Sequence, residues 1–159
     1  MPKQVVIRDG RIKDKEKIIE LWKEIMDYHM KISNIDFELV DDATEIFKKF
    51  FETNVRSINK KVIVAEEDGR IIGYMMGAIE KRPPVFKTTH RAFITDTGVT
   101  VSKRNLGIGT KLFNAFSSWA KEKGMKFISL AVVFENEIGI GFWKKQGFET
   151  MLLLQRKML

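Results

Sequence analysis

Apolar residues recur along this chain with two different spacings, and the spacing separates the expected helices from the expected strands. Residues 14–30 carry apolar side chains three or four positions apart, the spacing of an amphipathic helix, with Asp14 placed to cap its start. Further helices are expected from Asp41 or Asp42 through Phe51, over 107–123, and over 137–146. The pattern therefore predicts about four helices.

Short runs of strand-forming residues lie between these segments. The stretch "KVIVAEEDGRIIGYMMGAI" contains two such runs around an Asp-Gly pair, which is a strong signal of a β-hairpin. Other strands are expected over residues 4–8, in "RAFITDTGVTV", in "KFISLAVV", and at the end of the chain in "FETMLLLQRKM". The order of elements predicts an α/β (α+β) fold, in which helices flank a mixed, mostly antiparallel sheet of six to seven strands.

Composition limits the class of protein. The 159 residues are 44% hydrophobic and 31% charged, without an internal linker or repeat, which indicates a single domain over 1–159. The chain has no cysteine and two histidines, so neither disulfides nor a metal site is expected. No apolar run approaches the roughly 20 residues that span a bilayer, and the first residues lack the apolar core of a signal peptide. We therefore expect a cytoplasmic protein with no membrane partner.

The formal net charge of +7 is compatible with nucleic acid, anionic lipid or an anionic cofactor. The lysines are dispersed along the expected helices, as on a solvated face, and no clustered basic motif is present. Nucleic-acid binding is therefore disfavoured.

A glycine-containing turn precedes the expected helix over 107–123. The start of a helix has unpaired N–H groups and partial positive charge, so a turn lined by Gly107 and Gly109 is suited to hold phosphate. A Walker loop requires Gly-Lys-Ser/Thr, but Gly109 is followed by Thr110 and Lys111. A dinucleotide fingerprint requires a third glycine where Leu112 stands.

The pattern that remains is a basic residue, two spacers, Gly, one spacer and Gly, in "RNLGIG". With the strand before it and the helix after it, this segment resembles the coenzyme loop of the GNAT superfamily of N-acetyltransferases. A second segment, "ENEIGIGFWKKQGFE", resembles the other coenzyme-contacting helix of that family. The resemblance implies acetyl-coenzyme A as co-substrate, without a metal, and it implies coenzyme contacts from Val99, Val101, Arg104, Asn105, Leu106, Gly107, Ile108, Gly109, Thr110, Asn136, Gly139 and Phe142.

The second segment has glycines inside a short helix, and Gly139 and Gly141 each cost about 1 kcal/mol relative to alanine. Close approach of the coenzyme to the helix backbone would offset this cost. Tight packing of the helix on the sheet is the alternative explanation.

The resemblance also implies catalytic roles. It places an acidic residue or ordered water on "RAFITDTGV", where Asp96 is the candidate general base and Glu80 on the neighbouring strand is the reserve. The main chain of Val99 would bind the developing oxyanion. Trp143 stands where the family usually has a tyrosine acid, and an indole N–H is not a proton source near neutral pH. Tyr28, Tyr74 or water would have to replace it.

The sequence thus predicts an acetyl-coenzyme A-dependent N-acetyltransferase that moves an acetyl group to an amine by direct attack. The alternatives are a non-catalytic acyl-coenzyme A binding or sensing domain on the same fold, and a basic nucleic-acid-binding protein. The acceptor is a small-molecule or peptide amine whose pocket is shaped by Tyr28, His29 and residues 32–37. The oligomeric state stays open, although the apolar "MLLLQ" is suited to pairing across a homodimer.

Overall fold

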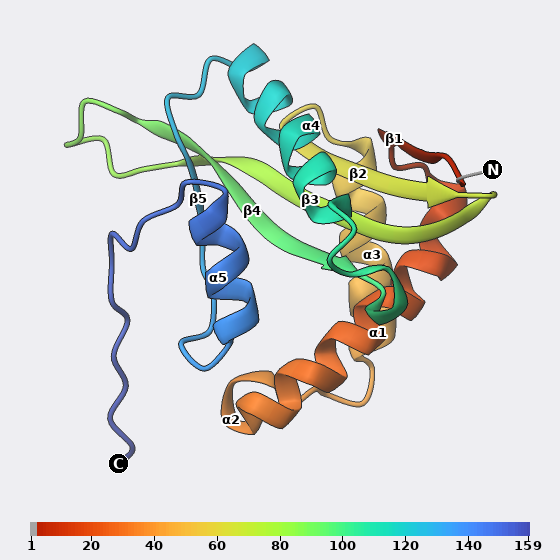
Figure 1. Ribbon diagram of the computed structural model, residues 1–159. Coiled ribbons are helices and arrows are strands. Elements are labelled where there is room, and N and C mark those ends of the chain that lie inside the picture. Colours follow the sequence, from red (N-terminus) through yellow and green to blue (C-terminus); the bar gives the residue numbers. More distant parts are fainter. Residues whose placement is uncertain (1–2) are drawn as a thin grey trace.

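The computed structural model describes residues 3–159, which form one sheet with helices on both faces (Figure 1). Its strands lie side by side in chain order: β1 (Val5–Asp9), β2 (Lys60–Glu67), β3 (Arg70–Lys81), β4 (His90–Val99) and β5 (Ile128–Leu130). Neighbouring strands are antiparallel except β4 and β5, which are parallel. The sheet is mixed and mostly antiparallel, as predicted, but it has five strands and not six to seven.

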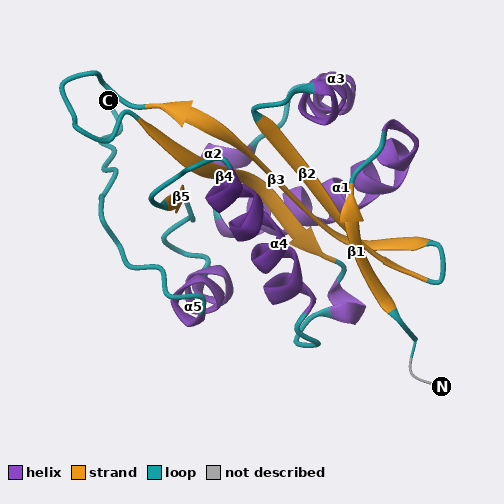
Figure 2. Cartoon of the chain, turned by 90° about the horizontal axis from the view of Figure 1, so that it is seen from above, coloured by secondary structure: helices purple, strands orange, loops and turns teal. Residues whose placement is uncertain are grey.

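Residues 3–159 contain five helices, four of which pack on the sheet while the short second helix follows the first. They are α1 (Lys15–Ile32), α2 (Asn34–Phe37), α3 (Ala43–Arg56), α4 (Ile108–Glu122) and α5 (Glu137–Lys145), with two short 3₁₀ turns, η1 (Ile12–Asp14) and η2 (Val101–Lys103). The four predicted helices are present within a few residues of their expected ends, and α2 is added in a segment expected to be irregular. Seen from above, α4 and α5 lie on one side of the sheet and α1 and α3 on the other (Figure 2).

Each face of the sheet has its own hydrophobic core, and β3 contributes to both. Met75 packs in the core beneath α4, with Leu112 and Phe116, whereas Tyr74 and Met76 belong to the core beneath α1 and α3. Successive side chains of a strand point to opposite faces, so a central strand covered on both sides is apolar at every position. This explains the continuous apolar run in the middle of the predicted hairpin.

The turn between β2 and β3 confirms the hairpin prediction. Asp68 has φ of 50° and Gly69 has φ of 74°, so both central residues are in the left-handed region. Two residues with positive φ are the signature of a type I′ turn, whose twist matches that of the flanking strands. The Asp-Gly pair was therefore sufficient to locate this turn from sequence.

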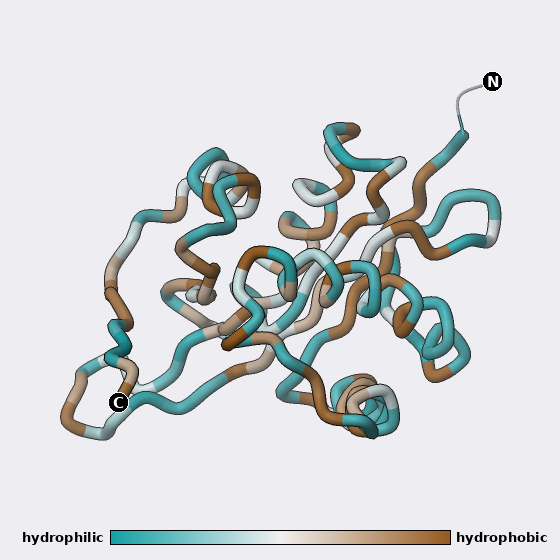
Figure 3. The backbone as a smooth tube through the Cα atoms, turned by 90° about the horizontal axis from the view of Figure 1, so that it is seen from below, coloured by the Kyte–Doolittle hydropathy of each residue, from teal (hydrophilic) through white to brown (hydrophobic). Residues whose placement is uncertain are grey.

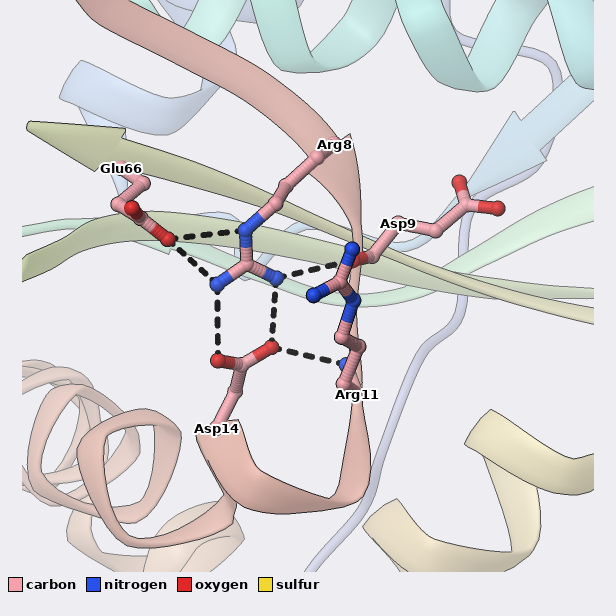
Figure 4. Close-up of polar contacts among 5 residues, drawn as sticks. All are labelled: Arg8, Asp9, Arg11, Asp14 and Glu66. Carbon is pink, nitrogen blue, oxygen red and sulfur yellow. Dashed lines mark hydrogen bonds and ion pairs between the residues drawn. The ribbon is translucent and has the colours of Figure 1, made fainter. Parts of the chain in front are cut away.

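The start of α1 is fixed to the sheet by a partly buried ionic network (Figure 4). The guanidinium of Arg8 donates to both carboxylate oxygens of Asp14, at 2.8 and 2.9 Å, and its Nε donates to Glu66 at 2.9 Å. Burial alone would raise the pKa of Asp14, but hydrogen bonds from Arg8 and from the backbone N–H of Arg11 outweigh it and lower the pKa. The carboxylate of Asp14 makes no side-chain cap of α1, contrary to the prediction, because Arg8 and Arg11 occupy it.

The end of the chain differs most from the prediction. Residues 146–159 contain no strand, so the strand predicted in "FETMLLLQRKM" is wrong, and β5 is also shorter than "KFISLAVV". A strand needs a neighbour for its backbone groups, and within residues 3–159 β5 is the last strand of the sheet. This segment makes no pair with β5, and its residues Met151, Leu152, Leu153 and Leu154 are exposed. In the view coloured by hydropathy, a hydrophobic stretch followed by hydrophilic residues lies along this part of the chain (Figure 3).

Candidate coenzyme and acceptor site

The turn before α4 has the geometry of an anion site. Asn105 has φ of 62° and Gly107 has φ of 74°, two left-handed residues that fold the loop back on itself. Gly107 is the N-cap of α4 and has no side chain that could cap the helix. The first helical bond runs from the N–H of Lys111 to the carbonyl of Gly107, at 3.1 Å. The N–H groups of 108–110 therefore have no partner within the helix and lie at its positive end.

Other predicted coenzyme residues surround this turn. Arg104 folds back so that its Nε donates to the carbonyl oxygen of Val99, at 3.0 Å. The hydroxyl of Thr110 accepts from the amide of Gln146, at 3.0 Å, which joins the loop to the end of α5. A Cβ on Gly109 would lie 3.0 Å from the ring of Phe142, so Gly109 allows α5 to cross close to the start of α4. Leu106 is exposed at the tip of the loop.

The edge of β4 next to this loop is open. β5 pairs only with Ala92–Ile94, whereas β4 continues to Val99. The N–H of Thr100 bonds to β3 through the carbonyl of Ile72, at 2.9 Å, so by alternation the N–H groups of Thr97 and Val99 point away from β3. An extended ligand can add to this edge as a strand does.

Val101 lies outside the strand, in η2, and its backbone N–H is already bound. Glu24 of α1 accepts from this N–H at 2.8 Å and from the hydroxyl of Thr100 at 3.2 Å. A main-chain bond from Val101 to a coenzyme therefore requires Glu24 to release it. Glu24 was not singled out from sequence, because its partner lies 77 positions away along the chain.

A β-bulge turns Asp96 toward the α1 face of the sheet. Met76 pairs with Asp96 but Gly77 pairs with Ile94, so Thr95 is an extra residue in β4. Ile94 faces the core beneath α4, and without the bulge Asp96 would face it too. With the bulge, Asp96 joins Tyr74 on the α1 face.

The carboxylate of Asp96 is poised to exchange a proton near neutral pH. Burial raises its pKa to about 7, although hydrogen bonds from the Tyr74 hydroxyl, at 3.0 Å, and from the backbone of Thr97 act in the opposite direction. The pKa of Tyr74 is itself raised well above its usual value by burial and by the charge of Asp96. Tyr74 is fully buried, so it is a partner of Asp96 and a poor candidate for the general acid.

Tyr28 is the tyrosine that borders the site. It extends from α1 toward the start of α5, where its hydroxyl donates to the side-chain oxygen of Asn136 at 3.4 Å. The same oxygen of Asn136 caps α5 by accepting from the N–H of Gly139, at 2.9 Å. A Cβ on Gly139 would lie 2.6 Å from the Asn136 amide, whereas nothing lies within 4 Å of one on Gly141. The absence of a side chain at Gly139 therefore leaves room for the capping side chain of Asn136, whereas the space beside α5 at Gly141 is open.

Three other residues that were considered for the site from sequence make contacts within the fold. Trp143 is buried, and its ring packs 5.2 Å from Phe148 and 5.9 Å from Phe113 between centroids. Glu80 forms an ion pair with Arg91 at 3.1 Å, toward the end of β3 that is distant from Asp96. His29 is half-buried against Phe37, and burial lowers its pKa.

Two further properties concern the whole described chain. Within residues 3–159, no group of three or more His, Asp or Glu side chains is arranged to hold a metal ion. Over the same residues, none of the helices combines the length and the apolar character needed to cross a bilayer.

Comparison with known proteins gives concordant results. The model of the acetyltransferase (GNAT) family matches residues 20–148. An N-alpha-acetyltransferase of Sulfurisphaera tokodaii is 31% identical over 114 residues, which are 67% of this chain and 66% of that protein. The chain thus spans about two thirds of that relative's length.

Solved structures share the fold at lower identity. A mutant of the BH1408 protein from Bacillus halodurans superposes with a TM-score of 0.86 at 22% identity, over 97% of this chain and 99% of that one. The aminoglycoside N-acetyltransferase AAC(6')-Iy, in complex with CoA, superposes with a TM-score of 0.75 at 20% identity, over 100% and 98%. From the family match, which covers most of the chain, we conclude that this protein belongs to the acetyltransferase (GNAT) family.

Proposed function

We propose that this protein is an acetyl-coenzyme A-dependent N-acetyltransferase that transfers the acetyl group directly from the thioester to an amine. The observation that carries the proposal is the start of α4. Three consecutive N–H groups, those of 108–110, lack helical partners beside the left-handed Gly107, and the open edge of β4 lies next to them. The diphosphate of coenzyme A fits the first feature, and its extended pantetheine arm fits the second.

Charge supports this assignment. Arg104 lies against the edge of β4, and the loop belongs to a chain with a formal net charge of +7. The partial charge at the start of α4 comes from backbone dipoles, so it persists at any pH at which the fold persists. Arg104, the N–H groups of 108–110 and the helix dipole would together hold the diphosphate.

The reaction needs an uncharged amine, and Asp96 is the proposed base. A free alkyl ammonium has a pKa of about 10.4, so little of it is reactive at neutral pH unless its proton is accepted. Asp96, with a pKa raised to about 7, accepts the proton directly or through water. The amine nitrogen then bonds to the acetyl carbon, the bond from carbon to sulfur breaks, and the sulfur leaves with its electron pair. The N–H of Val99 faces the edge where the carbonyl oxygen gains charge, whereas the N–H of Thr97 bonds to the carboxylate of Asp96.

The leaving sulfur does not need a strong acid. A thiol has a pKa of about 8.5, so departure as thiolate is tolerable near neutral pH. Trp143 is packed in the core and cannot supply a proton. Tyr28, whose hydroxyl lies at the start of α5, is the side chain placed to protonate the thiolate or to order a water that does so.

The acceptor is an amine of unassigned class, and the relatives indicate what to test. One relative is named an N-alpha-acetyltransferase, and a fold neighbour is an aminoglycoside N-acetyltransferase. A second candidate function is a domain that binds acyl-coenzyme A without turnover. It is favoured by one observation: the position where the family usually has a tyrosine acid is the buried Trp143.

A thiol-release assay separates these functions. Purified protein with acetyl-coenzyme A is offered peptides with free N-termini, peptides with lysine and a blocked N-terminus, aminoglycosides and polyamines. We expect thiol release with at least one class, and mass spectrometry should find one added acetyl group on that amine. Calorimetric binding of acetyl-coenzyme A without release for any amine would instead support the binding domain. An absence of binding would refute both functions.

A further inference from the structure

A cavity of about 280 Å³ lies where α3 and α4 end, beside the end of β1 and the start of β2. Figure 1 shows α3 and α4 both ending toward the top of the view, whereas the coenzyme loop lies at the other end of α4. The 15 residues of α4 span roughly 22 Å, so the cavity is separate from that loop. Its polar lining includes Asn54, Ser57, Lys60, Lys61, Trp119 and Lys123.

Cationic side chains outnumber anionic ones around this cavity. Three lysines line it, and Asp9 is the one carboxylate among the lining residues. Lys61 pairs with Asp9 at 2.7 Å, whereas neither Lys60 nor Lys123 forms an ion pair within the described residues 3–159. The negative ends of the α3 and α4 dipoles favour lysines at this place. Two ammonium groups without a carboxylate partner also supply the charge that attracts a small anion.

Hydrogen-bond donors line the same cavity. The hydroxyl oxygen of Ser57 accepts from the N–H of Asn59 at 3.3 Å, which leaves the hydroxyl hydrogen of Ser57 free to donate. Trp119 contributes an indole, whose N–H can only donate. The lysines, the hydroxyl and the indole are all suited to the oxygen atoms of an oxyanion.

Asn54 adds the opposite kind of group, an acceptor that lacks a donor. Its side chain is 1% exposed, and its Nδ2 donates to the carbonyl of Phe50 at 2.6 Å, one turn earlier in α3. Its Oδ1 is buried and has no partner in the part of the chain that the structure describes. Buried polar atoms are nearly always paired, so this oxygen indicates a donor from outside the chain. The helix dipoles account for the lysines but supply no such donor.

We propose that this cavity binds a phosphate group, with Lys60 and Lys123 beside its oxygens and Asn54 accepting a hydrogen bond from the ligand. Phosphate keeps at least one O–H at neutral pH, whereas sulfate has a similar shape and none. An acceptor in the cavity therefore favours phosphate over sulfate, which lysines alone do not. The cavity is larger than one phosphate ion, so it has room for phosphate with water or for a small phosphorylated molecule with hydroxyl groups.

Titration calorimetry with inorganic phosphate, and with sulfate at equal ionic strength, is the first test. We expect phosphate to bind about tenfold more tightly than sulfate at pH 7. Asn54→Leu keeps the approximate shape of the side chain and removes the acceptor, so the ratio of the two affinities should fall to about one. Equal affinities in the unmodified protein, or no binding of phosphate, would overturn the proposal.

Glycerol phosphate, titrated in the same way, distinguishes the two sources of the phosphate group. Tighter binding than inorganic phosphate would identify a small organic phosphate as the ligand, because its hydroxyl groups then contribute. Weaker or equal binding would identify inorganic phosphate.

The lysines are tested by a pair of double variants with the same loss of charge. Lys60→Gln with Lys123→Gln should lower the affinity for phosphate by about tenfold or more. Lys23→Gln with Lys87→Gln, at exposed positions far from the cavity in sequence, should change it by less than about twofold. This comparison holds even if Asn54→Leu fails to fold, and circular dichroism should find both double variants folded. An equal loss in the two would show that only overall charge attracts the anion, which would refute the site.

A crystal soaked in phosphate identifies where the anion binds. This is needed because the start of α4 is itself suited to an anion. Density for phosphate against Lys60, Lys123 and Asn54 would support the proposal. Phosphate bound only at the N–H groups of 108–110, or a water molecule alone against Oδ1 of Asn54, would overturn it. None of these readouts depends on acetyl transfer, so this site and the proposed function can fail independently.

Discussion

The two halves of the candidate site are built in different ways. The proposed coenzyme loop before α4 is one contiguous stretch, residues 104–110, and the groups proposed to bind the anion are mainly backbone N–H groups beside Gly107. The acceptor side is assembled from distant parts of the chain: Tyr28 on α1, Tyr74 on β3, Asp96 on β4 and Asn136 before α5. A backbone site of this kind depends on local φ angles, whereas a side-chain site depends on the register of strands and on helix packing.

The two halves should also respond differently to pH. The helix dipole at the coenzyme loop has no titrating group, so its attraction for an anion is unchanged between pH 6 and about 9. Asp96 has a pKa raised to about 7 and changes charge within that interval. The following experiments test this division between a fixed and a titrating half.

Replacing Asp96, the group that titrates near neutral pH, should have the largest effect on catalysis. Asp96→Asn keeps the shape of the side chain but cannot accept a proton, so we expect kcat to fall by about 10²-fold or more. Steady-state kinetics with saturating acetyl-coenzyme A measure this fall, and the KM for the coenzyme should stay within about twofold. Asp27→Asn, at an exposed position of α1, is the control. A kcat unchanged in Asp96→Asn would show that another group or water is the base.

The pH dependence of kcat/KM is a second test of Asp96 as the general base. Asp96 acts when deprotonated, so kcat/KM should rise about tenfold per pH unit below 7 and level off above it. Tyr74→Phe removes a hydrogen bond that lowers the pKa of Asp96, so the midpoint should move to higher pH. The profile is recorded for both proteins with the same acceptor. A midpoint that moves downward in Tyr74→Phe would contradict the role given to this hydrogen bond.

The coenzyme loop, which contains no titrating group, can be tested with two matched glycines. Gly107 and Gly124 both have φ of 74°, and nothing lies within 4 Å of a Cβ built on either. Alanine in the left-handed region costs about 1–2 kcal/mol, so both Gly→Ala variants should lose similar stability. Only Gly107→Ala should also raise the KM for acetyl-coenzyme A, by about tenfold, because it distorts the loop. Equal KM values in the two variants would remove the anion site from this turn.

The contact between Glu24 and the end of β4 links the two halves. Glu24→Ala frees the N–H of Val101 and the hydroxyl of Thr100, so η2 should become less ordered. We expect the KM for acetyl-coenzyme A to rise by about threefold to tenfold, in line with the loss of charge-assisted hydrogen bonds. Glu20→Ala on the same helix is the control. A KM that falls instead would show that Glu24 competes with the coenzyme for Val101.

The smallest effect on catalysis is expected at Trp143. Its ring packs among Phe113, Phe142 and Phe148 and does not reach the acceptor side. Trp143→Phe should leave kcat nearly unchanged and lower the free energy of unfolding by roughly 1–3 kcal/mol, through lost packing. Urea denaturation and steady-state kinetics on the same sample measure both quantities. A hundredfold fall in kcat would show that Trp143 does more than pack.

Much of the fold was predictable because it rests on local patterns. The Asp68-Gly69 turn, the four longer helices and the loop at Gly107 each follow from residues close together in sequence. The family resemblance rested on this loop and on a second contiguous segment, residues 135–149, and the family match confirmed it. The strand expected at residues 148–158 failed because a strand requires a neighbour, and the local pattern says nothing of whether one exists.

The sequence by itself determined the Asp68-Gly69 turn, the glycine turn before α4 and the four longer helices. Only the tertiary structure decided that a bulge at Thr95 turns Asp96 toward Tyr74, and that Glu24 holds the N–H of Val101. Helical periodicity and turn chemistry act within a few residues. Strand register and the pKa of a buried carboxyl depend on atoms that the fold brings together from distant positions.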